Sequence, residues 1–240
     1  MKSISTVILF VCALLVCGCN SIGNGVPVSG KIQIRLPQSI EIQGDWYAEI
    51  ICNSSENSIE TVIDSNLEDC IGISAYGNLK ISLPTKISPM VLPVLKIRLQ
   101  KNFSELSVED KSICKVINFS SKNKLEIELS DRAVCVFDNI QAENIEAELS
   151  DYAKLSLKGS VKKLSAEVEK RAVLEAENVD TLKLECSDNA VCRIKQCNSA
   201  GVYAENAAIV TFKEAKNVNS RIRDDAQINC PVNILENIKK

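Results

Sequence analysis

Glutamate is the residue type whose spacing most clearly suggests chemistry in this chain. Six glutamates fall on two regular series, and successive members of the longer series are 18 to 20 residues apart. They are Glu126, Glu128, Glu146, Glu148, Glu167 and Glu185. Carboxylates held side by side repel one another, so a hard cation such as Ca²⁺ or a basic partner would stabilise them. The spacing predicts a cation or partner face, with a Ca²⁺ affinity on the order of millimolar. We predict no other cofactor.

The first 19 residues carry the signals for export and for a covalent lipid. An apolar run from Ile4 to Val16 is long enough for a signal-peptide core, but it is shorter than the roughly 20 residues of a membrane-spanning helix. The sequence Val16-Cys17-Gly18-Cys19 resembles a bacterial lipobox, in which the thiol of the last cysteine carries diacylglycerol. This pattern predicts a signal peptide over residues 1–18, lipidation at Cys19 and a flexible tether over residues 19–30. The predicted location is the bacterial envelope, with the anchor in the outer membrane and the protein facing the periplasm or the cell surface.

Cysteine is frequent, with 11 residues, whereas histidine is absent. Without imidazole, Ser-His-Asp and Cys-His catalysis and His-ligated metals are excluded, and we predict no catalytic or metal-binding residue. Free cysteine behaves as a small hydrophobe, and several cysteines alternate with aliphatic residues at equivalent repeat positions, so we expect most of them to pack in the core. Export to an oxidising compartment also allows disulfides. The two pairs considered are Cys52–Cys70 and Cys114–Cys135.

An internal repeat covers the second half of the chain. Its copies start at residues 104, 125, 145, 164, 182, 200 and 218, so the spacing shortens from 21 to 18 residues. Within a copy the apolar period is two, because Leu125, Ile127 and Leu129 alternate with glutamates. A polar break rich in Ser, Asp and Asn follows, and then a second alternation begins. Two short strands and two turns per copy predict one coil of a β-solenoid, with equivalent strands about 4.8 Å apart.

The details of the repeat exclude three other solenoids. The chain lacks the leucine-rich repeat pattern, the aliphatic residue at every sixth position of the left-handed hexapeptide helix, and the glycines of calcium-binding solenoids. The remaining prediction is an all-β fold, a right-handed parallel β-helix of about seven coils over residues 101–230. Residues 31–100 alternate in shorter stretches and are expected to form a β-rich cap that merges into the coils. Residues 231–240 are expected to cap the other end.

These features together resemble the head GIN domain family, also called putative auto-transporter adhesins. The resemblance rests on Cys19, Lys31-Ile-Gln-Ile, Ile63-Asp-Ser-Asn-Leu, Gly77-Asn-Leu-Lys-Ile-Ser-Leu, Leu95-Lys-Ile-Arg-Leu and the repeats. It covers nearly the whole mature chain. The turns depart from the family pattern, because Ser130-Asp131-Arg132-Ala133 replaces a glycine-rich turn. The resemblance implies a β-helical envelope lipoprotein and does not imply a particular molecular activity.

Composition and coil length separate the remaining function classes. A net charge of −3 and an aromatic content of 4% argue against a nucleic-acid partner. Strands and tight turns use almost all of each 18–21-residue coil, so long loops that could wall a catalytic groove are missing. The sequence therefore favours a non-catalytic binding or adhesion module with a membrane anchor and a protein or glycan partner. An envelope structural or assembly protein is the alternative, and a carbohydrate-active enzyme is the least favoured class.

Overall fold

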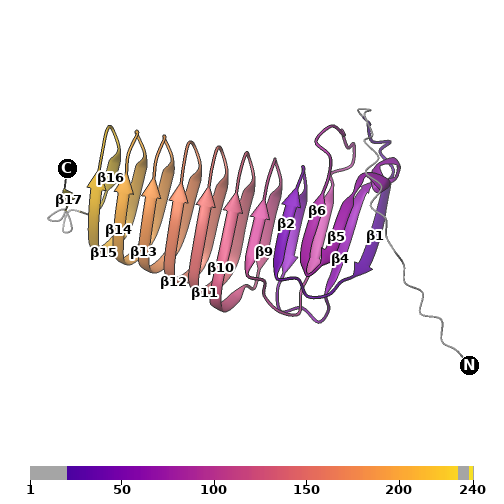
Figure 1. The fold of residues 1–240 in the computed structure, drawn as a ribbon, viewed down its shortest axis with the longest axis horizontal. Coiled ribbons are helices and arrows are strands. Elements are labelled where there is room, and N and C mark those ends of the chain that lie inside the picture. Colours follow the sequence, from indigo (N-terminus) through magenta and orange to yellow (C-terminus); the bar gives the residue numbers. More distant parts are fainter. Residues whose placement is uncertain (1–20, 232–237, 240) are drawn as a thin grey trace, which may run out of the picture.

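The protein is an elongated solenoid of β-strands. A computed structural model describes residues 21–231 and 238–239, so Cys19 lies outside the described residues. The strands stack side by side along the long axis, with β1 at one end and β16 at the other (Figure 1). They form one sheet of 17 strands, and the single helix within the described residues is the 3₁₀ segment Ser65–Cys70. The predicted all-β parallel β-helix is confirmed.

Seven turns of the solenoid run from β8 to β16. Each solenoid turn runs along a first face, passes through a tight β-turn and continues along a second face. Equivalent strands of neighbouring solenoid turns pair in parallel. From β11 onward one strand of 14 to 16 residues continues around a corner and joins the second face of one turn to the first face of the next. The strands are β8 (Glu105–Val108), β9 (Ile113–Ile117), β10 (Ser120–Leu129), β11 (Val134–Leu149), β12 (Lys154–Val168), β13 (Val173–Cys186), β14 (Val191–Ala204), β15 (Ile209–Ile222), β16 (Gln227–Asn229) and β17 (Ile238–Lys239).

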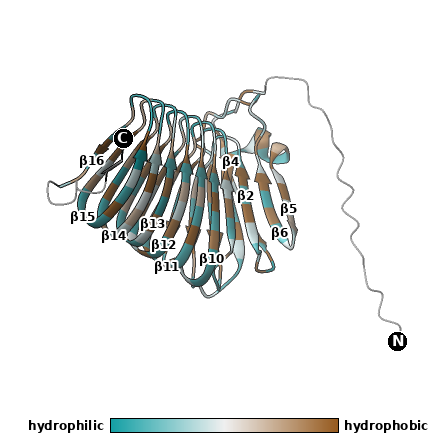
Figure 2. Ribbon diagram, turned by 60° about the vertical axis from the view of Figure 1, so that its left-hand side comes forward, coloured by the Kyte–Doolittle hydropathy of each residue, from teal (hydrophilic) through white to brown (hydrophobic). Residues whose placement is uncertain are grey.

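The core is built from columns of inward-facing residues. Successive side chains of a strand point to opposite sides, so apolar and polar residues alternate along each ribbon (Figure 2). On the first face Leu129, Leu149 and Val168 stack in register, and all three are buried. A further inward column lies at the corner after the second face, although the sequence predicted only two strands per coil. It consists of Ala142, Val161, Val179, Cys197 and Ala215.

Residues 31–100 add two further turns, whose order in space differs from their order in sequence. Strand β2 (Ser39–Gln43) pairs with β6 (Asn78–Ser82) on one side and with β8 on the other. Strand β3 (Tyr47–Ile51) likewise lies between β7 (Val94–Arg98) and β9. The turn of the solenoid formed by β2 and β3 is therefore inserted between two turns that follow it in the chain.

Antiparallel strands close the N-terminal end. Strand β1 (Pro27–Gln33) pairs with β4 (Ser58–Asp64), β4 pairs with β7, and β5 (Gly72–Tyr76) pairs with β6. Antiparallel pairing ends the parallel stack with strands of opposite direction and so covers its edge. Strand β1 begins inside the segment predicted as a tether, because Val28 pairs with Ile63 and continues the sheet.

The tight turns between the two faces use residues in the left-handed region. The first central residue of each turn has a positive φ, and Asp and Asn tolerate this conformation better than other residues with a side chain. These residues include Asp131 (φ 58°), Asp151 (60°), Lys170 (59°), Asp188 (53°) and Asn206 (53°). Each turn is closed by a backbone hydrogen bond, as when the Ala133 N–H donates to the Ser130 carbonyl at 3.1 Å. The Asp-rich break in the repeat is therefore a backbone requirement.

One turn contains an alanine in this unfavourable conformation, which leads to a prediction. Ala207 has a φ of 60° and follows Asn206, whereas the equivalent Arg132 has no positive φ. The left-handed region costs about 1–2 kcal/mol for a residue with a Cβ, and replacement by glycine removes this cost. Part of the gain is lost again, because glycine gives up more backbone conformational entropy on folding. We expect Ala207→Gly to raise the free energy of unfolding by about 0.5–1 kcal/mol in urea titrations, whereas Arg132→Gly should lower it. An Ala207→Gly variant no more stable than wild type would contradict the prediction.

Candidate functional site

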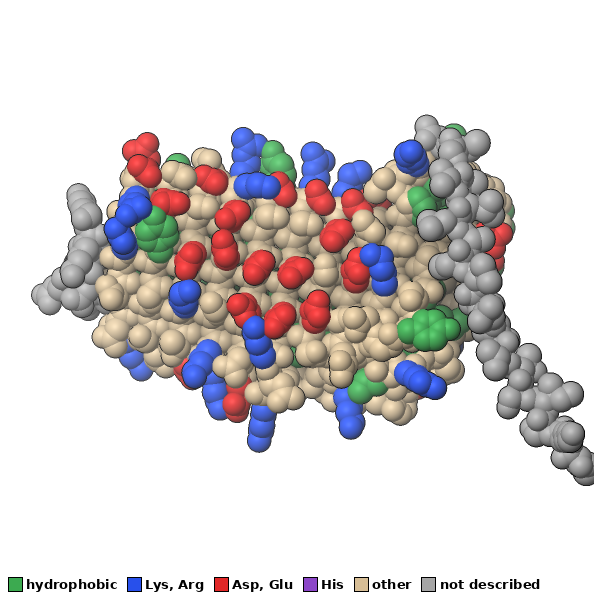
Figure 3. All heavy atoms as spheres, viewed as in Figure 1, with side chains coloured by type: hydrophobic (Ala, Val, Ile, Leu, Met, Phe, Trp, Pro, Cys, Tyr) green, Lys and Arg blue, Asp and Glu red, His purple; other side chains and the backbone are tan. Residues whose placement is uncertain are grey.

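The longer glutamate series forms one column on the outer side of the first face. Glu128 pairs in register with Glu148, Glu148 with Glu167, and Glu167 with Glu185. These residues belong to successive turns, so their Cα atoms follow the strand spacing of about 4.8 Å. Asp and Glu side chains gather over the middle of this face, and most Lys and Arg side chains lie along its margins (Figure 3). The register needed for a continuous acidic surface is present.

Lysines neutralise part of this surface. The Lys124 ammonium lies 2.8 Å from a Glu126 carboxylate oxygen and also pairs with Glu146. The Lys183 ammonium lies 3.1 Å from Glu185. These pairs are exposed, so each contributes little to stability, but each compensates a charge locally. Three of the six predicted glutamates are therefore partnered.

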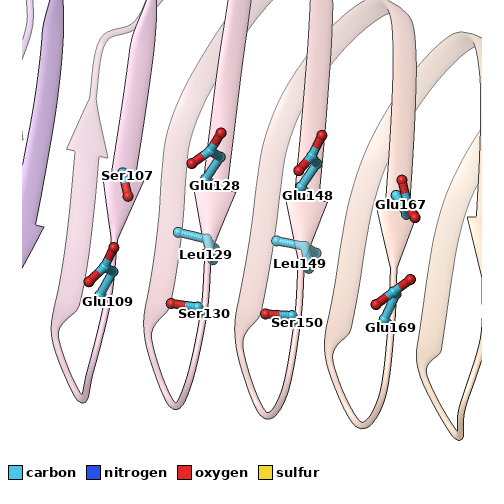
Figure 4. Close-up of a pocket in the computed structure, with 10 residues that line it drawn as sticks. All are labelled: Ser107, Glu109, Glu128, Leu129, Ser130, Glu148, Leu149, Ser150, Glu167 and Glu169. Atoms are coloured by element: carbon cyan, nitrogen blue, oxygen red, sulfur yellow. The ribbon is translucent and has the colours of Figure 1, made fainter.

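A hollow lies beside the other three, and we call it the acidic hollow. Glu109, Ser130, Ser150 and Glu169 occupy equivalent positions on four successive turns, next to the column that contains Glu128, Glu148 and Glu167. The short serines leave space between the two long glutamates, and the resulting hollow has a volume of about 260 Å³. Figure 4 shows Glu109 and Glu169 at its two ends and Ser130 and Ser150 between them.

Five carboxylates therefore surround the acidic hollow: those of Glu109, Glu128, Glu148, Glu167 and Glu169. Within the part of the chain that the structure describes, none of the five lies within 4.0 Å of a Lys or Arg nitrogen. The sequence analysis missed Glu109 and Glu169. They occupy the same turn position as the serines, so aligning the repeats at that position could have identified them.

The electrostatics of the acidic hollow disfavour its charged state. Partial burial, then Glu148, Glu105 and Glu126, raise the pKa of the Glu128 carboxyl. Burial, then the adjacent Glu169, raises the pKa of Glu167. The pKa of Glu109 is also raised, first by burial and then by Glu41 and Asp110.

Neutralising three of these charges is expected to stabilise the protein at neutral pH. In Glu128→Gln/Glu148→Gln/Glu167→Gln three in-register repulsions disappear, those of Glu128 with Glu148, Glu148 with Glu167 and Glu167 with Glu185. Each amounts to about 0.9 kcal/mol at 4.8 Å in water and to less in salt. We expect the free energy of unfolding near pH 7 to rise by about 1 kcal/mol, as measured by urea unfolding at low ionic strength. A less stable triple variant would contradict the repulsion inferred from this column.

The pH dependence of stability follows from the sign of these pKa shifts. A carboxyl whose folded pKa lies above its unfolded value of about 4.3 favours folding most when it is protonated. Its contribution is therefore lost as the pH rises from about 4.3 through the raised pKa. We expect wild-type stability to increase as the pH falls from about 7 to about 5, and to increase less in the triple variant. If the melting temperatures of wild type and triple variant changed equally with pH in this range, the raised pKa values would not belong to these glutamates.

Six of the eight cysteines in the described part of the chain are buried, where the core requires small apolar groups. Cys114 and Cys135 are buried side by side on adjacent turns, and Cys192 occupies the same inward column. The thiols of Cys186 and Cys192 meet across one tight turn, with 3.4 Å between their sulfur atoms. Burial raises the pKa of Cys52 to about 12, with a smaller contribution from Cys114. High thiol pKa values make such groups unreactive in the folded protein.

The sequence-predicted disulfides stay predictions. Cys114 and Cys135 are in register on neighbouring strands, which is close enough for a bridge. Cys52 is buried after β3, and Cys70 ends the 3₁₀ helix. Among the described residues no group of three or more His, Cys, Asp or Glu side chains converges on one metal-binding point.

Comparison with known proteins places the chain in a family. The family model described as "Putative auto-transporter adhesin, head GIN domain" matches residues 37–223. The chain belongs to this head GIN domain family. The match begins just before β2 and ends just after β15, so the matched region comprises the interleaved turns and the regular solenoid up to β15.

Solved structures share the fold of this head GIN domain. A putative adhesin from Parabacteroides distasonis matches with a TM-score of 0.63 at 15% identity, covering 88% of this chain and 99% of that one. A putative adhesin from Bacteroides fragilis matches with a TM-score of 0.62 at 12% identity, covering 87% and 95%. A putative lipid binding protein from Parabacteroides distasonis matches with a TM-score of 0.65 at 14% identity, covering 87% and 98%.

Two further comparisons concern sequence and membrane insertion. None of the curated proteins compared with the chain matches it in sequence. No helix within the described residues is long and apolar enough to span a membrane. The membership in an adhesin family indicates a protein of the bacterial envelope or surface.

Proposed function

We propose that this chain is a lipid-anchored protein of the bacterial envelope that binds a basic partner in its acidic hollow and has no catalytic role. The observation that carries the proposal is the cluster of five carboxylates without an ion-pair partner among the described residues. Several carboxylates elsewhere are compensated, as in the Lys31–Glu56 pair at 2.8 Å and the Arg98–Glu60 pair at 2.7 Å. Uncompensated charge opposes folding, and a partner of opposite charge would relieve that cost. The same charges would orient the partner as it binds.

The size of the acidic hollow favours basic side chains of a protein. Its volume of about 260 Å³ is below the roughly 300–1,000 Å³ of small-molecule sites. Each carboxylate column takes one residue from each turn, so a single Ca²⁺ would reach few oxygens. Several Lys or Arg side chains on an extended partner segment would each find a carboxylate, and an Arg could bind bidentately. A glycan partner and weak Ca²⁺ binding are the alternatives.

The proposed anchor at Cys19 complements this surface. Lipid would hold the protein at the outer membrane, facing the periplasm or the cell surface, while the solenoid supplies a rigid surface for contact. The family and the putative adhesins with the same fold support a binding role. A structural or assembly role in the envelope is the second candidate, since a rod of stacked turns also suits a spacer.

Capture from envelope extract tests the proposal. The lipid-free chain should retain a defined set of proteins at low salt and release it at high salt, because exposed charge contacts are screened. Retention that does not depend on salt would contradict an acidic contact surface. Turnover of any acidic glycan in a substrate panel would contradict the non-catalytic role.

A further inference from the structure

Exposed apolar side chains are concentrated at the N-terminal end of the solenoid. The described part of the chain exposes 12 large hydrophobic residues, and nine of them lie between residues 22 and 92. One of the nine belongs to β3, which is inserted further along the solenoid, and eight remain. Four of these eight come from two short segments, residues 22–26 and residues 90–92. They are Ile22 (68% exposed), Val26 (57%), Met90 (69%) and Leu92 (63%), and we call them the apolar patch.

The two segments that carry the apolar patch are joined by backbone hydrogen bonds. The Ser88 N–H donates to the Ser21 carbonyl at 2.9 Å, and the Gly23 N–H donates to the Ser88 carbonyl at 2.9 Å. Ile22 also forms a parallel bridge with Ser88. Both segments lie at the β1 end of the molecule (Figure 1).

The buried carboxylate of Asp64 fixes both segments to the end of β4. It accepts hydrogen bonds from the Gly25 N–H at 2.6 Å, the Met90 N–H at 2.9 Å and the Val91 N–H at 3.0 Å. Burial raises the pKa of Asp64, but these backbone donors together outweigh burial and hold its pKa below the usual value. A Cβ on Gly23 would lie 2.3 Å from Asp64 Oδ2, so glycine permits the close approach. The apolar patch is thus presented by a fixed backbone.

Chain length relates this patch to the proposed lipid. Cys19 and Ser21 are two residues apart, so their Cα atoms are at most about 7.6 Å apart. The polar layer on each side of a bilayer is roughly 5–8 Å thick. If Cys19 carries acyl chains that enter the hydrocarbon core, then Ser21 and the attached Ser88 loop lie at the level of the lipid headgroups.

We propose that the apolar patch is a bilayer-contact surface that seats the N-terminal end of the solenoid in the membrane interface. The inference rests on the proposed lipidation of Cys19. Four apolar side chains bind a membrane weakly alone, but beside a lipid anchor they act as a second attachment that sets orientation. The solenoid then projects its other turns, and with them the acidic hollow, away from the membrane.

A tryptophan in the patch tests this contact directly. The full chain carrying Met90→Trp is purified with its native lipid and reconstituted into phosphatidylethanolamine–phosphatidylglycerol vesicles containing shallow brominated acyl chains. Trp46, the single native tryptophan, is buried, so the wild-type signal supplies the background. The added emission at position 90 should fall at least twofold relative to non-brominated vesicles. Asn219→Trp, on an exposed position of β15, should show no change.

A second variant separates contact from mere proximity. Val26→Trp should be quenched as strongly as Met90→Trp, and Met90→Glu/Leu92→Glu in the same chain should abolish that quenching while circular dichroism shows an intact fold. Vesicle-bound protein with an acylated Cys19 and no quenching at position 90 would overturn the contact surface and leave the anchor standing. Absence of acyl mass on Cys19 would overturn both.

Discussion

The Gly159→Ala variant is expected to lose about 3 kcal/mol of unfolding free energy. Gly159 has a φ of 133°, and an added Cβ would lie 2.3 Å from the Ile140 carbonyl oxygen and 2.9 Å from the Ile140 nitrogen. Both atoms belong to the backbone of a buried core residue, so the neighbour cannot move aside cheaply. The unfavourable φ contributes about 1–2 kcal/mol, and overpacking contributes about 1–3 kcal/mol more.

Thermal unfolding and hydrogen exchange measure this loss. For a chain of this size the melting temperature should fall by about 6–12 °C. Because a solenoid depends on contacts between neighbouring turns, exchange should accelerate first in β11, β12 and β13. Gly201→Ala is the matched control, since no atom lies within 4 Å of its added Cβ, and its melting temperature should stay within a few degrees of wild type. Equal melting temperatures for the two variants would contradict the close approach of Gly159 to the backbone of Ile140.

Cys19→Ala is expected to release the protein from the membrane fraction almost completely. Stable anchoring by lipid requires two or more acyl chains, and the thiol of Cys19 is their proposed attachment point. Metabolic labelling with an alkynyl fatty acid should tag the wild type and leave the variant unlabelled. Cys17→Ala serves as the control, because it alters the same signal without removing the proposed acceptor. Equal labelling of Cys19→Ala and wild type would contradict lipidation at this residue.

Local periodicity explains why much of the solenoid could be predicted from the sequence. The two-residue period places Leu125, Ile127 and Leu129 on one side of a strand, and nearly equal repeat lengths keep the turns in register. The same register predicts that Glu128 and Glu148 lie side by side. These features depend on residues close in sequence or on the regular recurrence of the repeat.

Features that depend on distant partners could not be predicted in this way. The insertion of β2 and β3 between later turns is a choice of pairing partner, and no local pattern specifies it. The acidic hollow depends on serines at positions where neighbouring turns have Glu109 and Glu169, which period-two alternation does not reveal. The order of residues 21–26 depends on Asp64, about 40 residues away in the chain.

Quantitative capture from envelope extract by three baits, two of which are variants of equal charge, is the most direct test of binding through the acidic hollow. The baits are the wild type, Glu128→Gln/Glu148→Gln/Glu167→Gln, and a control, Glu175→Gln/Glu177→Gln/Glu214→Gln, whose carboxylates contact Arg193, Lys195 and Gln196. Both variants lose three negative charges, so non-specific attraction changes equally. We predict that wild type and control retain the same partner and that the acidic-hollow variant retains at least tenfold less, a difference of about 1.4 kcal/mol. Equal retention by all three baits would contradict the proposed function.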